Sequence, residues 1–111
     1  MLVKTALEDV IIKFEYFYDD DKTSITLGLP LGVTAKVCAT YQTFLGQSYI
    51  NPKEVHKFTK AFGRKIALER AIRKYASFVW NSLPEEHRNY TEKEIRSQVW
   101  EGVKKSGMKF K

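Results

Sequence analysis

The spacing of apolar residues in this 111-residue chain changes near residue 50, and this change limits the fold more than any other feature. Before it, in residues 10–18, apolar and polar side chains alternate with the period of two that is typical of a β-strand. After it, apolar residues recur with the spacing of an amphipathic helix. Strands followed by helices indicate an α+β fold, in which the helices cover one face of an antiparallel sheet.

The first half predicts a three-stranded antiparallel β-meander. Its strands are predicted in residues 10–18, 25–29 and 33–45. The sequence "DDDKTS" and the pair Pro30 and Gly32 separate the strands as turns. Connections this short join neighbouring strands in antiparallel order, because a parallel crossover needs a longer segment.

The second half predicts one long helix followed by a shorter C-terminal helix. The sequence "NPKE" combines a capping asparagine, a first-turn proline and a following acid, and starts a helix predicted over residues 52–81. Gly63 within it suggests that another element packs closely there. The predicted apolar stripe of this helix is Val55, Phe58, Ala61, Phe62, Ile66, Leu68, Ile72, Ala76, Val79 and Trp80. "TEKE" is a second capping box and opens a helix through about Lys105. The buried side of that helix is predicted to be Ile95, Val99 and Val103.

The length of the chain fits one compact domain. We expect residues 1–111 to form it, with the β-meander in residues 1–50 and the helical part in residues 51–111. There is no apolar run of about 18 residues, so we expect no membrane span, and the N-terminus lacks the pattern of a secretory signal. Cys38 stands alone and cannot form an internal disulfide, which favours a cytoplasmic protein.

The net charge of +6 comes from one segment. Residues 53–74 contain eight Lys or Arg and two acidic residues, whereas the rest of the chain has 11 of each sign. A concentration of positive charge of this kind favours an anionic partner. The predicted contact residues for nucleic acid or another phosphate-bearing ligand are Lys57, Lys60, Arg64, Arg70 and Lys74. The alternative is that they form an ordinary solvated helix face.

Lys65, Glu69 and Arg73 are a second candidate group, because they are four residues apart and fall within the predicted apolar stripe. Glu69 can pair with both neighbours along the helix. One interpretation places the three at the rim of the stripe, with their charged ends in water. The others are a buried structural network and a pocket for a phosphate or carboxylate group.

Aromatic residues supply candidate contacts of another kind. Phe14, Tyr16, Phe17 and Tyr18 lie close together on the first predicted strand, as in proteins that stack single-stranded bases. Phe14, Tyr16 and Tyr18 should face the core, whereas Phe17 should face outward. Phe17 and Trp100 are therefore the candidate protein-contact residues, with partial burial in the core as the alternative reading for both.

Catalytic and metal-binding patterns are missing from the sequence. His56, His87 and Cys38 lack the spacing of a metal site, and "LGLPLG" lacks the lysine of a phosphate loop. No nucleophile motif is present. We therefore expect no enzymatic activity, no metal and no cofactor.

The segment "FGRKIALERAIRK", preceded by "TAKVCATYQ", resembles small accessory proteins of bacteriophages and mobile elements. The match is carried by Phe62, Gly63, Arg64, Ala67, Leu68, Arg70 and Ala71. Those proteins have a charged pair before the glycine, where this chain has residues 60–62, "KAF". The resemblance implies a phage or plasmid origin, a location in the host cytoplasm and a role in binding host components, without catalytic residues.

The expected function is thus capture of nucleic acid, or of another phosphate-bearing ligand, by the basic helix. A second hypothesis is a counter-defence inhibitor that binds and blocks a host defence protein through apolar and aromatic residues. A third is a homo-oligomer that sequesters a nucleotide signal in a pocket with Lys65 and Arg73.

Overall fold

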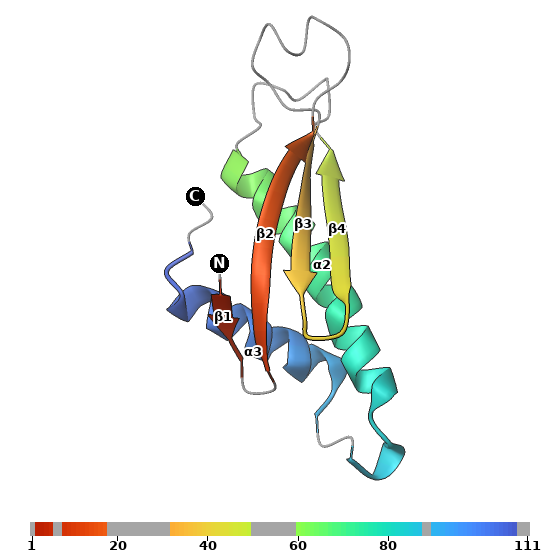
Figure 1. Ribbon diagram of the computed structural model, residues 1–111. Helices are drawn as coiled ribbons and strands as arrows, with labels where there is room; N and C mark the ends of the chain where they lie inside the picture. The colour runs from red at the N-terminus through yellow and green to blue at the C-terminus, as the bar shows by residue number, and fades with distance from the viewer. Residues whose placement is uncertain (1, 6–7, 18–31, 50–59, 88–89, 109–111) are drawn as a thin grey trace, which may run out of the picture.

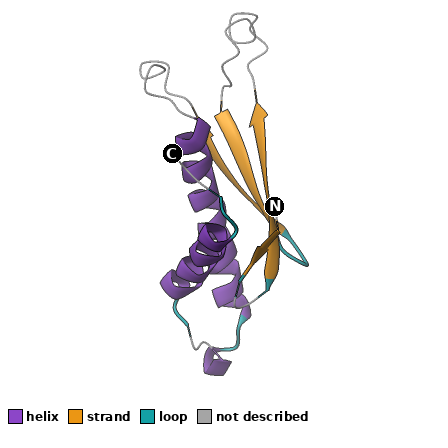
Figure 2. Cartoon of the chain, turned by 90° about the vertical axis from the view of Figure 1, so that its left-hand side faces the viewer, coloured by secondary structure: helices purple, strands orange, loops and turns teal. Residues whose placement is uncertain are grey.

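The protein is a two-layer α+β domain in the computed structural model (Figures 1 and 2). The residues that the structure describes are 2–5, 8–17, 32–49, 60–87 and 90–108. Within these ranges, an antiparallel sheet forms one layer, and two α-helices form the other. Figure 2 shows the layers from the side, with both helices against the same face of the sheet. No described helix is long and apolar enough to cross a membrane.

The sheet has four strands in the described residues, not three, so the prediction of a three-stranded meander was wrong in this detail. The strands are β1 (Leu2–Lys4), β2 (Asp9–Phe17), β3 (Gly32–Cys38) and β4 (Thr43–Tyr49), and they lie side by side in chain order. Every neighbouring pair is antiparallel (Figure 1). The predicted strand over residues 25–29 lies outside the described residues.

The segment predicted as one strand over residues 33–45 forms β3, a turn and the start of β4. The Ala39 amide donates to the Gln42 carbonyl at 2.9 Å and closes the turn. Folding back at this point pairs Val37 with Phe44 and places both in the core. A single continuous strand would leave the polar backbone of its second half without a neighbour, which is unfavourable.

Helix α2 (Lys60–Ser82) packs on β3 and β4, and the part of the predicted helix before residue 60 lies outside the described residues. Its buried face differs from the predicted stripe, because Phe62 is 58% exposed. Alanines and a glycine make up much of the buried face, where the helix lies close to the sheet, beside the large residues Leu68, Ile72 and Tyr75. The buried residues are Ala61, Gly63, Ala67, Leu68, Ala71, Ile72, Tyr75 and Ala76.

Helix α3 (Glu92–Lys105) agrees with the prediction in its start, end and buried side. Thr91 and Glu94 form the capping box, in which the Glu94 amide donates to the Thr91 hydroxyl at 3.2 Å. A 3-10 turn, η2 (Glu85–His87), lies between the two helices. α3 packs against α2 and, at Gly102, against the backbone of β1. In Figure 1 it passes behind β1 and the lower part of β2.

Candidate functional site

The edge strand β4 and helix α2 approach each other closely at Gly46. A Cβ atom at this position would collide with the Ala67 carbonyl oxygen and the Ala71 nitrogen, and would lie 2.9 Å from the Cβ atom of Arg70. Nearby, the buried Ser48 hydroxyl donates to the carbonyl of Gly63 at 2.8 Å. The close packing predicted for Gly63 is therefore made by β4.

This approach places a row of basic side chains along the sheet edge. Arg70 Nη1 donates to the backbone carbonyl of Gln47 at 2.5 Å, which ties the helix to the edge strand. A groove of about 570 Å³ runs beside this contact. Its lining residues are Leu45, Gly46, Gln47, Tyr49, Arg70, Arg73 and Lys74, and we call it the β4 groove.

The three cations of the β4 groove are suited to an anionic ligand. Arg70, Arg73 and Lys74 are all exposed, so a ligand can reach them from solvent. Arg73 has an acidic neighbour, Glu69, at 3.7 Å, but both side chains are more than half exposed, so this pair holds the guanidinium weakly. Arg70 donates one N–H of its guanidinium to Gln47, and the other N–H groups of the guanidinium can donate to a ligand. Such groups bind phosphate oxygens through charge-assisted hydrogen bonds.

No described helix covers the outer face of the sheet (Figure 2), and Gln47 and Tyr49 of β4 connect this face to the groove that they line. Across its upper end the strand register aligns Phe17, Gly32 and Tyr49. The Phe17 and Tyr49 rings meet edge to face over Gly32, with centroids 5.3 Å apart. A side chain at Gly32 would lie 2.6 Å from the Phe17 ring, so the glycine makes room for the pair.

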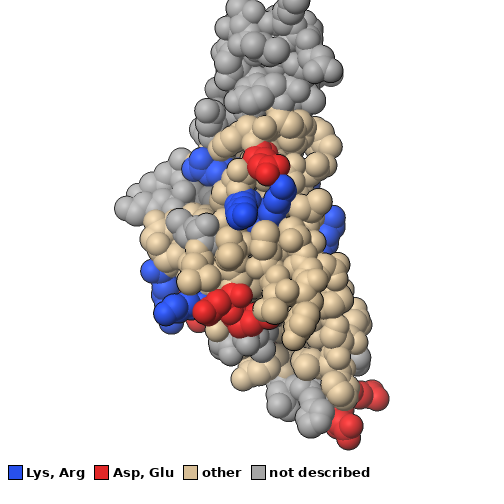
Figure 3. Space-filling model, in the orientation of Figure 1, with Lys and Arg blue, Asp and Glu red and all other residues tan. Residues whose placement is uncertain are grey.

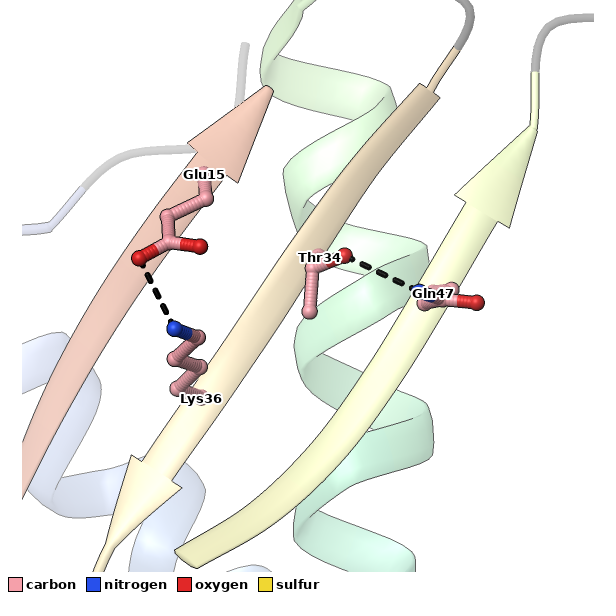
Figure 4. Close-up of polar contacts among 4 residues, drawn as sticks. All are labelled: Glu15, Thr34, Lys36 and Gln47. Carbon is pink, nitrogen blue, oxygen red and sulfur yellow. Dashed lines mark hydrogen bonds and ion pairs between the residues drawn. The ribbon is translucent and has the colours of Figure 1, made fainter. Parts of the chain in front are cut away.

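Polar residues occupy the middle of this face, and Figure 4 shows how they lie. Lys36 forms a 2.8 Å ion pair with Glu15 on the neighbouring strand. The Gln47 amide nitrogen donates to the Thr34 hydroxyl at 3.2 Å. Lys13 lies directly opposite Lys36 in the register. Figure 3 looks onto this face, where basic and acidic side chains lie next to each other within a largely uncharged surface, with further basic atoms along the β4 border.

The predicted basic group is divided by the fold. Arg70 and Lys74 reach the β4 groove, but Arg64 lies elsewhere. Arg64 is half-buried, donates to the Tyr16 hydroxyl at 2.9 Å and lies 6.0 Å from the centre of the Phe14 ring. Lys57 lies outside the described residues, and Lys60 is the first residue of α2, with its side chain not described.

The group of Lys65, Glu69 and Arg73 lies on the exposed side of α2. Their exposure agrees with the interpretation that the charged ends of these three side chains lie in water. It contradicts the interpretation that the three form a buried structural network. Arg73 lines the β4 groove together with Arg70, whereas Lys65 does not.

The two candidate protein-contact residues have different surroundings. Phe17 is half-buried and faces outward with Lys13 and Glu15, as the alternation of its strand predicted. Trp100 is half-buried and packs against the core. Phe14 also packs against the core from the inner face of β2.

Sequence reasoning missed Tyr49 and Gln47, which join the groove to the outer face. Both lie beyond residue 45, where the last predicted strand ends. The alternation along β4, in which Phe44, Gly46 and Ser48 are buried, was the signal that could have found them. Among the described residues, no three His, Cys, Asp or Glu side chains gather as metal ligands would.

Comparison with known protein families, with characterised proteins and with solved structures finds no match to this chain. The geometry of the β4 groove and of the adjoining sheet face therefore carries the functional argument.

Proposed function

We propose that this protein acts by binding rather than by catalysis, and that it captures nucleic acid or another phosphate-bearing ligand in the β4 groove. Arg70, Arg73 and Lys74 supply the positive charge. The basic helix α2 is the binding element, and the ligand contacts the side of it that lines the β4 groove. Arg64 is left out, because its guanidinium is engaged with Tyr16 and Phe14.

The convergence of three exposed cations on one groove is the observation that carries this proposal. On an ordinary solvated helix face, the charged side chains would be spread around the exposed side. Lys65 is placed in this way, because it is exposed and lies outside the groove. Here Arg70, Arg73 and Lys74 line the same concave surface against the sheet edge. A phosphate in the groove would meet more than one cation, so the attractions to a single ligand add up.

The groove also suits an extended ligand. Its lining includes several residues of β4, Tyr49 among them, together with the three cations of α2. A backbone of successive phosphates can follow such an edge, while a single small anion would contact only part of it. This geometry favours a nucleic-acid strand among phosphate-bearing ligands.

The test compares two double variants with equal changes in charge. In Arg70→Glu/Arg73→Glu the groove loses its cations, and we expect at least about tenfold weaker binding of a fluorescent oligonucleotide at low salt. In Lys65→Glu/Lys93→Glu the same number of exposed basic residues is reversed away from the groove. We expect this control to bind within about threefold of the wild type.

Equal losses in both double variants would show that the charge acts diffusely and would contradict the groove. Undiminished binding by Arg70→Glu/Arg73→Glu would contradict it directly. A wild-type protein that binds no oligonucleotide at low salt would redirect the search to a host protein as the partner. Circular dichroism of each variant verifies that the fold is retained.

A further inference from the structure

We propose that the aromatic pair on the outer face of the sheet, Phe17 and Tyr49, is a stacking platform for an unpaired base. The ligand of the β4 groove would then be a single strand of nucleic acid, whose backbone lies on the cations while one base lies on Tyr49. This inference rests on the proposed function and specifies its ligand.

The Tyr49 ring is exposed yet fixed in orientation. It is 63% exposed, and the half-buried Phe17 ring contacts it edge to face at 5.3 Å. At its other end, the Tyr49 hydroxyl donates to the Gln47 side-chain oxygen at 2.9 Å. A ring held at two points loses little conformational freedom when a base stacks on it, which favours binding.

Gly32 is part of the same arrangement. Glycine weakens a strand, and its presence within one often marks close approach by another group. Here any larger residue would meet the Phe17 ring and the Ser48 carbonyl. The glycine thus lets Phe17 lie across β3 and reach Tyr49 on the far strand. The core gains little from this contact, because the pair lies on the face away from the helices.

The ring and the cations belong to one site. Tyr49 and Gln47 line the β4 groove together with Arg70, Arg73 and Lys74. A nucleic-acid strand carries an aromatic base and a phosphate on each repeating unit. The site therefore offers a partner to both parts of that unit, which matches the chemistry of single-strand binding.

A double helix does not fit the same surface. Its bases are stacked on each other, and only their edges are reachable from the grooves. A ring on an open sheet face can stack only on a base that has left that arrangement. We therefore expect single strands to bind more tightly than duplexes of the same sequence.

Base identity should matter little. Within the part of the chain that the structure describes, Gln47 hydrogen-bonds to Tyr49, and its amide is thus engaged with Thr34 through nitrogen and with Tyr49 through oxygen. Its remaining hydrogen-bonding capacity for reading a base edge is small. Stacking itself tolerates all bases, because each has an aromatic face.

Strand addition by a peptide is the less favoured occupant of this edge. Arg70 donates to the Gln47 backbone carbonyl, an acceptor that an added strand would need. The guanidinium therefore blocks the edge at this position, while its charge remains available to a phosphate.

The experiment compares two strands of equal charge by fluorescence anisotropy on the full chain. One is an oligothymidylate of about 15 nucleotides, and the other is an abasic strand of the same length. We expect the wild type to bind the base-containing strand about tenfold more tightly. Tyr49→Ala should remove most of this difference and leave affinity for the abasic strand unchanged. Tyr49→Phe, which keeps the ring, should retain it.

Tyr41→Ala is the matched control, since Tyr41 is 91% exposed at the turn between β3 and β4, at the other end of these strands. It should bind both strands as the wild type does. Phe17→Ala should weaken the base-dependent part of binding, because Tyr49 then loses its neighbour. Thermal unfolding of each variant establishes that it folds.

The outcomes separate the two proposals. If both strands bind equally and Arg70→Glu/Arg73→Glu abolishes binding, the groove stands and the stacking platform is wrong. If a duplex binds more tightly than either strand, the platform is also wrong. If the wild type binds neither strand at low salt, the proposed function fails, and the platform fails with it.

Discussion

Tyr75 is the largest fully buried side chain among the described residues, and it carries a polar atom into the core. It is 1% exposed, and its hydroxyl donates to a carboxylate oxygen of Glu8 at 2.9 Å. The hydroxyl thus finds a partner at the boundary of the core, next to the connection between β1 and β2. Burial of the phenol, together with its hydrogen bond to Glu8 and the negative charge of that residue, raises the pKa of Tyr75.

This raised pKa predicts a loss of stability at alkaline pH. The unfolded chain ionises Tyr75 near its ordinary pKa of about 10, whereas the folded protein keeps it neutral to higher pH. The contribution to the free energy of unfolding is therefore complete below pH 10 and falls as the pH rises above it. Above that pH, the wild type should lose about 1.4 kcal/mol per pH unit more than Tyr75→Phe does.

Urea unfolding between pH 8 and pH 11 measures this difference. At neutral pH, Tyr75→Phe should be about 1 kcal/mol less stable, because Glu8 loses a donor. Tyr41→Phe is the control, since that side chain is exposed and its loss should leave the alkaline slope as in the wild type. Parallel slopes for Tyr75→Phe and the wild type would show that Tyr75 is not the group responsible.

At the scale of elements, Gly46 determines how α2 sits on the sheet. On strand propensity alone, Gly46→Ala should stabilise the protein, because glycine is unfavourable in a strand. The backbone of α2 occupies the space that the new methyl group needs, at Ala67 and Ala71. Backbone atoms cannot move aside as a flexible side chain can. The substitution should therefore destabilise the protein instead of stabilising it. We expect Gly46→Ala to lower the free energy of unfolding by about 1–3 kcal/mol.

Urea unfolding at neutral pH tests this expectation. Thr43→Ala is the control, because Thr43 lies on the same strand with its side chain exposed. Gly46→Ala should also weaken ligand binding, since a displaced α2 moves Arg70 away from Gln47. An unchanged or raised stability would mean that α2 and β4 do not pack as closely as described.

The parts of the fold that depend on neighbouring residues could be predicted from the sequence. The capping box of α3 requires only Thr91 and Glu94, and both of its hydrogen bonds are present. The outward direction of Phe17 follows from alternation along one strand. The short β1 could not be predicted in this way, because Leu2–Lys4 is too brief to show alternation.

The parts that depend on distant contacts could not be predicted. Phe62 was assigned to the buried face because large apolar residues dominate a helical pattern, whereas Ala67 and Ala71 face the sheet. For the same reason, the sequence could not distinguish Arg64 from Arg70. Their different roles follow from the positions of β2 and β4 relative to α2.

At the scale of the whole molecule, the basic residues behind the net charge of +6 have different surroundings. Some basic residues are engaged within the fold, as Lys36 is with Glu15 and Arg64 is with Tyr16. Three others, Arg70, Arg73 and Lys74, line the β4 groove. The salt dependence of binding reports how many cations contact phosphates, and it therefore separates a local site from attraction by the whole chain.

Three phosphate contacts with a single strand predict that the logarithm of the binding constant falls with a slope of about −2 against the logarithm of salt concentration. If the complete excess of +6 acted together, the slope would be about −4. Arg73→Gln should reduce the slope by about 0.7, because one contact is lost. Lys65→Gln, on the same helix but outside the groove, should leave it unchanged. A slope near zero would indicate an apolar interface, and an equal reduction in both variants would mean that the charge of the whole helix, rather than the β4 groove, holds the ligand.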